Sequence, residues 1–134
     1  MAFALRAEGL WKLYESGESV IQAVQDVSLS IKQGSMVAIM GPSGCGKTTL
    51  LNVLSGIDEP NSGTVMINGE NLYGSSDDER TRVRGKHMGF IFQEFNLLPV
   101  MTALENVELP LLIQGTPANE ARKEATKALT AVGL

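Results

Sequence analysis

One glycine-rich loop constrains the fold of this 134-residue chain more than any other feature. It matches the pattern GxxxxGK[ST] and comprises Gly41, Pro42, Ser43, Gly44, Cys45, Gly46, Lys47, Thr48 and Thr49. Glycine has no Cβ atom, so the loop can wrap closely around an anion and turn its backbone N–H groups inward. An apolar run precedes the loop and a helical pattern follows it, which is the context that a phosphate site requires. The loop therefore predicts a binding site for a nucleoside triphosphate.

Two side chains of this loop have predicted roles in the site. Lys47 can place its ammonium group between the β- and γ-phosphates, and the Thr48 hydroxyl is the expected Mg²⁺ ligand. The helix that starts near Thr48 directs its unpaired N–H groups and the positive end of its dipole at the same anion. The alternative is an ordinary glycine-rich turn, which the position between a buried strand and a helix disfavours.

Hydrophobic patterning predicts the strands around the loop. Apolar and polar residues alternate over 3–7 and 27–31, which is typical of half-buried strands, and Asn68-Gly69 is typical of a tight hairpin. Short apolar runs at 37–40 and 88–92 predict strands buried on both faces.

Capping residues and proline predict the helices. One helix is expected over 48–54 and another over 77–85. A third should start after Thr102 and be kinked or ended by Pro110, and a fourth should start at Pro117. Early strands followed by a β-turn-α unit and a helical stretch indicate an α/β domain.

Composition excludes several classes of protein. The net charge of −4 disfavours a general nucleic-acid binder, so no nucleic-acid partner is expected. A single cysteine rules out an internal disulfide framework, and with one histidine it makes a His/Cys zinc site unexpected. No apolar run approaches the roughly 18 residues that would predict a transmembrane helix. The N-terminus also lacks the basic and apolar regions of a signal peptide.

Further segments extend the match beyond the loop. Residues 10–14 (LWKLY), residues 24–31 followed by Gly34, and residues 90–93 (FIFQ) lie at spacings that resemble the ATP-binding cassette (ABC) ATPases. The segments at 89–93, 96–99 and 102–107 resemble the lipoprotein-releasing and macrolide-export group of these cassettes. The resemblance implies an α/β P-loop NTPase fold of the ABC-ATPase type, here a β-rich N-terminal part plus the start of the core sheet with helices, and incomplete.

The resemblance also implies roles for individual residues. ATP and Mg²⁺ would be the cofactors, and Tyr14 would stack on adenine, with Trp11 as the rival aromatic. Gln93 would bring its amide oxygen to Mg²⁺ or to the attacking water, the alternative being a polar residue at a strand end. The apolar residues Phe95, Leu97 and Leu98 either receive a membrane subunit or fill the core of the domain. His87 precedes the Gln93 segment and does not match the switch histidine of the family.

Several motifs of the family are not found in this sequence. The signature LSGGQ, an apolar run ending in Asp-Glu and a later histidine are all missing, so residues 1–134 are interpreted as the N-terminal part of one ATPase domain. We expect that this chain alone does not hydrolyse ATP at a useful rate. The complete protein is expected to act at the cytoplasmic face of a membrane. Its partners would be a second ATPase subunit and an integral membrane permease.

Three other interpretations remain open from the sequence. A regulatory cassette that acts with a membrane protein without transport would share every residue named above. A stand-alone nucleotide-binding or interaction module would bind nucleotide and never hydrolyse it. A P-loop kinase is the most distant alternative, because it would have no reason to carry the Tyr14 and Gln93 segments at these positions.

Overall fold

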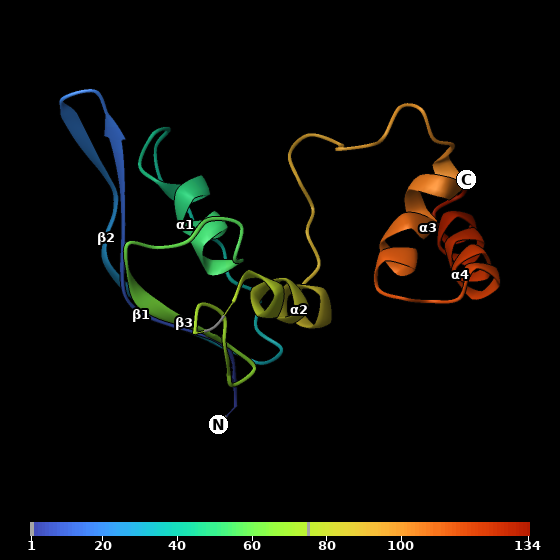
Figure 1. Cartoon of the computed structure of the whole chain (residues 1–134), viewed down its shortest axis with the longest axis horizontal. Helices are drawn as coiled ribbons and strands as arrows, with labels where there is room; N and C mark the ends of the chain where they lie inside the picture. Colours follow the sequence, from blue (N-terminus) through green and yellow to red (C-terminus); the bar gives the residue numbers. More distant parts are fainter. Residues whose placement is uncertain (1, 75) are drawn as a thin grey trace. The chain divides into compact units, whose positions relative to one another are not determined.

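An antiparallel sheet and two helices form the first of two units, which cover Met1–Gly89 and Phe90–Leu134. The computed structural model describes residues 2–74 and 76–134 (Figure 1). Within the described residues the sheet has the strand order β2-β1-β3-β4, and every pairing is antiparallel. The strands are β1 (Phe3–Ser16), β2 (Ser19–Lys32), β3 (Ser62–Ile67) and β4 (Glu70–Asn71).

The first two strands are longer than the alternation predicts, and they form an extended hairpin (Figure 1). Ala7 and Leu10 are both buried although strict alternation would put residues three apart on opposite faces. The ladder shifts register between them, at Gly9, whose φ is +58°. A Cβ on Gly63 of β3 would approach the Gly9 carbonyl oxygen to 2.5 Å, so the two backbones pass each other closely here. The irregularity turns both apolar residues into the core.

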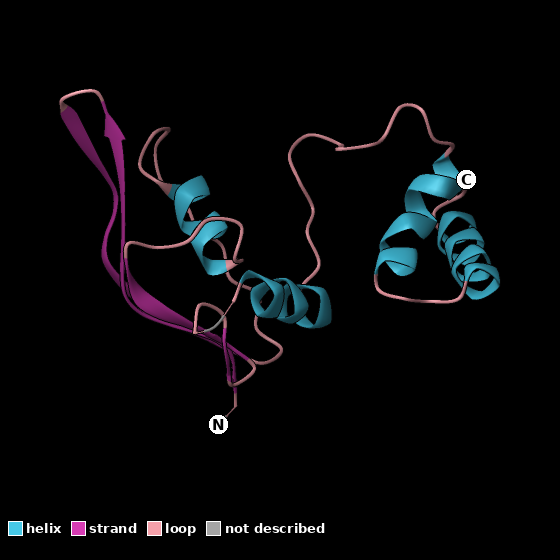
Figure 2. Ribbon diagram, viewed as in Figure 1, coloured by secondary structure: helices cyan, strands magenta, loops and turns pink. Residues whose placement is uncertain are grey.

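The helices begin where their capping residues predict. They are α1 (Lys47–Leu54) and α2 (Asp77–His87) in the first unit, and α3 (Ala103–Ile113) and α4 (Ala118–Ala131) in the second (Figure 2). The Ser76 side chain accepts a hydrogen bond from the Glu79 N–H, and Thr102 and Glu105 form a reciprocal capping box. Both arrangements satisfy donors that a helix leaves unpaired at its start.

Pro110 does not end the third helix, so of the two outcomes predicted for it, a kink or an end, the second is wrong. The helix α3 continues past Pro110 to Ile113, and the Pro110 carbonyl oxygen accepts from the Gln114 N–H at 3.1 Å. Proline lacks only its own N–H, so the carbonyl group four residues earlier loses its helical donor, whereas the proline carbonyl can still accept from the next turn.

The core of the first unit lies between the sheet and its two helices. The largest fully buried side chains come from both strands and helices and are Leu10, Val53, Val65, Leu72 and Val83. The hairpin that joins β3 to β4 has φ of +46° at Asn68 and +83° at Gly69, the left-handed conformation that this dipeptide adopts readily. The hairpin predicted at Asn68-Gly69 is therefore confirmed.

Two predicted strands are absent from the structure. Residues 37–40 and 88–92 are not strands, and Met40 and Ile91 are exposed rather than buried. An extended segment becomes a strand only when a neighbour accepts and donates its ladder hydrogen bonds. In the described residues no strand pairs with either segment. The apolar runs therefore do not predict strands here, because a hydrophobic segment without a pairing partner does not become one.

Candidate nucleotide-binding site

The glycine-rich loop leads directly into α1, with Gly46 as the residue before its first turn. Gly44 and Gly46 have φ of +80° and +97°, where a side chain would strain the backbone. A Cβ on Gly46 would also come within 2.4 Å of the Ala23 carbonyl oxygen on β2. Glycine at this position lets the loop lie against β2 and fixes where α1 begins.

The N-terminus of α1 is suited to an anion. The first N–H groups of any helix lack partners within the helix, and here no side chain caps them. No acidic residue lies in the first turn of α1. A phosphate group would therefore meet uncapped N–H groups and the positive end of the helix dipole, with no carboxylate in the first turn to repel it.

Lys47 lies at the same end of α1 and bonds to its own loop. Its ammonium group donates to the carbonyl oxygen of Gly41 and, at 2.8 Å, to that of Pro42. The Cys45 Sγ atom lies 3.7 Å from the same nitrogen. The beginning of the loop is thus folded back over the lysine, which sits in the concavity of the loop.

The loop and Tyr14 line one cleft of about 490 Å³. Its walls comprise Tyr14 from β1, Ile21, Gln22 and Ala23 from β2, and Ser43, Gly44, Cys45, Gly46, Lys47, Thr48 and Thr49. Gly41 and Pro42, whose carbonyl oxygens accept from Lys47, are not among these lining residues. Trp11, the rival aromatic, is not among them either. The structure therefore brings Tyr14 and most of the loop together across residues far apart in the sequence.

A magnesium ion would find a suitable donor in this cleft. Thr48 is exposed in the first turn of α1, and hydroxyl oxygen is a ligand type that Mg²⁺ accepts. Among the described residues, no cluster of three His, Cys, Asp or Glu side chains could hold a metal by itself. The donor set thus fits an ion held jointly with phosphate oxygens. Gln93, the second predicted ligand, belongs to the second unit, so its role stays a prediction.

Tyr14 is bound by residues that the sequence analysis did not single out. Its hydroxyl donates to Asp58 Oδ2 at 2.6 Å, and the Lys12 ammonium lies 5.1 Å from the centre of its ring. The hydrogen bond to Asp58 raises the pKa of the Tyr14 hydroxyl, and it lowers the pKa of the Asp58 carboxyl. A cation two residues before an aromatic on one strand was the available signal for Lys12. Nothing local marked Asp58, because its contact with Tyr14 spans 44 positions.

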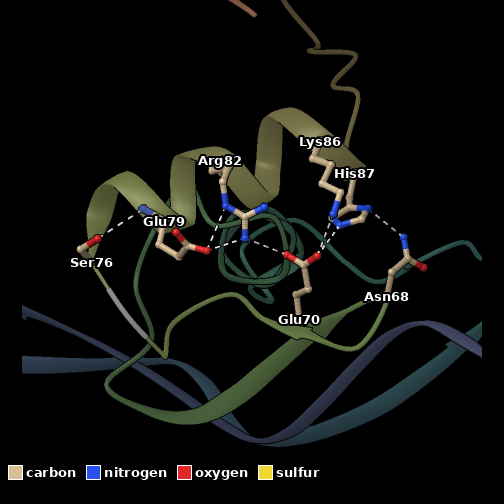
Figure 3. A network of polar contacts seen from close by, with 7 residues as sticks. All are labelled: Asn68, Glu70, Ser76, Glu79, Arg82, Lys86 and His87. Atoms are coloured by element: carbon tan, nitrogen blue, oxygen red, sulfur yellow. Dashed lines mark hydrogen bonds and ion pairs between the residues drawn. The ribbon is translucent and has the colours of Figure 1, made fainter.

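His87 lies in a separate polar network between α2 and the β3–β4 hairpin (Figure 3). Its Nδ1 atom is 3.2 Å from Asn68 Nδ2, and its Nε2 atom is 3.4 Å from Glu70 Oε1. Arg82 and Lys86 also bind the Glu70 carboxylate, each at 3.0 Å. His87 is not among the residues that line the Tyr14 cleft.

A larger hollow, of about 710 Å³, lies on the open face of the sheet. Residues of β1, β3 and the β3–β4 hairpin line it, including Arg6, Glu8, Thr64 and Met66. None of the predicted site residues lines this hollow. Its two charged side chains, Arg6 and Glu8, are exposed and form an ion pair with each other at 2.7 Å. The smaller cleft beside the loop is therefore the candidate site.

Comparison with known proteins identifies the family of the chain. The family model described as ABC transporter matches residues 24–134. An ABC transporter ATP-binding protein of Thermotoga maritima, described as uncharacterized, is 46% identical over 125 residues, which cover 93% of this chain and 53% of that protein. The ATP-binding protein LolD of the lipoprotein-releasing system of Bordetella avium is 44% identical over 131 residues, which cover 98% of this chain and 57% of LolD.

A solved structure extends the likeness to the fold. The ATP-binding cassette MJ0796 of Methanocaldococcus jannaschii, a dimer in a post-hydrolysis state bound to ADP and Pi, matches with a TM-score of 0.86 and 43% identity. The match covers 94% of this chain and 56% of that one. It confirms the predicted α/β fold class. The chain spans about half the length of the relatives described here, and none of its described helices is long and apolar enough to cross a membrane.

Proposed function

The chain belongs to the ABC transporter family, and from this membership we propose that it is the nucleotide-binding, N-terminal part of a transporter ATPase subunit. The observation that carries the proposal is the single cleft shared by Tyr14, the glycine-rich loop and the start of α1. An aromatic ring at one end and bare helix amides at the other suit a molecule with a flat base and a phosphate chain. ATP is such a molecule.

The residues of the cleft, and Gln93 of the second unit, have separate roles in this proposal. The amides at the start of α1 and the Lys47 ammonium bind the phosphates, and Tyr14 stacks on the adenine. Thr48 and Gln93 supply the oxygen atoms that would hold Mg²⁺, which neutralises phosphate charge when bound. Lys47 and Gln93 are the chain's own candidates for a role in catalysis.

The partners follow from the relatives. MJ0796 is described as a dimer, and LolD as part of a lipoprotein-releasing system. We propose that the complete subunit likewise dimerises and acts with an integral membrane permease at the cytoplasmic face of the membrane. ATP hydrolysis by that dimer would drive the permease.

Titration calorimetry with ATP and Mg²⁺ tests the binding proposal. The chain should bind ATP, and Lys47→Ala should weaken the affinity by at least about tenfold, since hydrogen bonds from a charged donor contribute about 1.5–3 kcal/mol. Lys123→Ala, which removes an exposed cation from α4, is the matched control and should leave the affinity unchanged. A folded chain that does not bind ATP, or equal affinities for wild type and Lys47→Ala, would contradict the proposal.

A further inference from the structure

The carboxylate of Asp58 contacts two residues of β1 at once. Its Oδ2 atom accepts the hydrogen bond from the Tyr14 hydroxyl at 2.6 Å, and its Oδ1 atom accepts one from Lys12 Nζ at 2.9 Å. Lys12 Nζ also donates to the backbone carbonyl oxygen of Glu59 at 2.8 Å. The Lys12 side chain is only 14% exposed, so water competes weakly for this ammonium group. The Tyr14 ring is thereby fixed at its hydroxyl and along its face.

Asp58 is itself fixed to the far end of α1. Its N–H donates to the Asn52 carbonyl oxygen at 3.1 Å, and its carbonyl oxygen accepts from the Tyr73 hydroxyl at 2.8 Å. The same Tyr73 hydroxyl donates to the Val53 carbonyl oxygen in the last turn of α1. Asp58, held at the end of α1, therefore links the Tyr14 ring to the helix whose start carries the phosphate-binding amides.

We propose that Asp58 is a positioning residue for the nucleobase, one that fixes the Tyr14 ring at a set spacing from the phosphate-binding end of α1. The inference rests on the proposed function, since it assumes that Tyr14 stacks on a base. The Lys12 ammonium covers one face of the ring, which leaves the opposite face for stacking. A ring already fixed before binding loses less conformational entropy when the base arrives. Hydrogen bonding lowers the pKa of the Asp58 carboxyl, so the acceptor remains ionised at neutral pH.

This arrangement gives the Tyr14 hydroxyl a role that stacking alone does not require. Phenylalanine could stack on a base equally well but could not bond to Asp58. Asparagine at position 58 keeps the shape of the side chain, yet only one of its two terminal atoms accepts hydrogen bonds. If its Oδ1 atom accepts from Lys12, the Tyr14 hydroxyl faces an N–H donor and must change from donor to acceptor, so a charge-assisted hydrogen bond is replaced by a weaker neutral one.

Binding of two probes to the full chain tests the inference. ATP reports on base and phosphates together, whereas tripolyphosphate reports on phosphates alone. Tyr14→Phe and Asp58→Asn should each weaken ATP binding about two- to tenfold, the range for losing one pre-ordered side chain. Tripolyphosphate binding should not change. Glu15→Gln removes a neighbouring exposed carboxylate from β1 and is the matched control for charge, which should leave both affinities unchanged.

The double variant separates positioning from general damage. If Asp58 acts through the Tyr14 hydroxyl, Tyr14→Phe/Asp58→Asn should bind ATP within about twofold of the weaker single variant. Independent, multiplying effects would overturn the inference, as would equal losses for ATP and tripolyphosphate. Tyr14→Phe keeps the ring and removes only the hydroxyl, so it should fold and gives the test a result even if Asp58→Asn is unstable.

The two proposals fail in different ways. If Tyr14→Ala weakens ATP binding while Tyr14→Phe and Asp58→Asn do not, the positioning role is wrong and the nucleotide site stands. If wild type binds neither probe, or Lys47→Ala weakens neither, the nucleotide site itself is wrong and the positioning role goes with it.

Discussion

Arg122 on α4 binds the carboxylate of Glu108 on α3 through two hydrogen bonds, Nε to Oε2 and Nη2 to Oε1, each 2.8 Å long. The two side chains differ in exposure: that of Arg122 is 55% exposed and that of Glu108 only 9%. The ion pair joins the two helices of the second unit beside the buried Ala121 and Ala125. Removing Arg122 and removing Glu108 should therefore cost different amounts of unfolding free energy.

We predict that Arg122→Gln destabilises the second unit more than Glu108→Gln does. Without Arg122, a nearly buried carboxylate loses its charged partner, whereas without Glu108 the guanidinium remains in water. Urea unfolding followed by helical circular dichroism measures both variants. Lys123→Gln, an exposed change on the same helix, should leave the midpoint unchanged. Equal midpoints for the two variants would contradict this prediction and show that the burial of Glu108 does not change the stability of the second unit.

Glycine substitutions should separate the positions that need glycine from one that does not. Gly46→Ala combines a φ of +97° with a Cβ 2.4 Å from a backbone oxygen, so it should prevent the loop from folding against β2. Gly44→Ala has only the strained backbone and should cost about 1–2 kcal/mol of unfolding free energy.

Gly85 provides the contrast, because it lies within α2 and a Cβ there would meet no atom within 4 Å. Gly85→Ala should raise the unfolding free energy by about 0.5–1 kcal/mol, since alanine loses less backbone entropy in a helix. Chemical denaturation of the three variants provides the ranking. A Gly46→Ala protein as stable as the Gly44→Ala protein would contradict the clash with Ala23.

The Glu70 network should make stability depend on pH in the acid range. Hydrogen bonds from Lys86 and His87, followed by one from Arg82, lower the pKa of Glu70 from 4.5 to about 2. A carboxyl whose pKa is lower in the folded state stabilises the fold above its ordinary pKa, and that contribution disappears as pH falls toward the folded value. Glu70→Gln should therefore be less stable than wild type at neutral pH, and the difference should shrink between about pH 4.5 and about pH 2.

Unfolding curves at a series of pH values measure this difference. Glu15→Gln, which removes an exposed carboxylate from β1, should show no such pH-dependent difference from wild type. A Glu70→Gln deficit that stays constant down to pH 2 would mean that packing, rather than charge, accounts for it.

Tyr73 should stabilise the segment that follows α1. Its hydroxyl shares one proton between the carbonyl oxygens of Val53 and Asp58, and burial raises its pKa to about 12. Tyr73→Phe should lower the unfolding free energy by about 1–2 kcal/mol, because two carbonyl groups lose their donor. Tyr14→Phe, at an exposed ring, is the control and should cost less. A raised pKa also means that wild type loses stability as pH rises from 10 toward 12, and Tyr73→Phe should lack that loss.

Local features of this chain could be predicted from its sequence because neighbouring residues determine them. The Asn68-Gly69 hairpin depends on two residues that tolerate positive φ, and the starts of α2 and α3 depend on caps one turn long. The glycine-rich loop belongs to the same category. In each case the chemistry and the conformation lie within a few positions of each other.

Features that depend on distant partners were not predictable. The runs at 37–40 and 88–92 have the composition of buried strands, but composition does not say whether a neighbouring strand exists. Asp58 and its partner Tyr14 are 44 positions apart, so no local pattern connects them. The irregular register around Gly9 likewise depends on how closely β3 passes β1.

The hydrogen bonds of Lys47 mean that its ammonium group already has partners before any phosphate arrives. To bind phosphate the ammonium must leave the carbonyl oxygens of Gly41 and Pro42, or share its protons with them. Binding is thus an exchange of acceptors rather than a simple addition of one. Calorimetry should record a smaller heat from this lysine than a free ammonium group would give. Before phosphate binds, Lys47 therefore also stabilises the conformation of the loop, and the two carbonyl oxygens occupy the place of phosphate oxygens around its ammonium group.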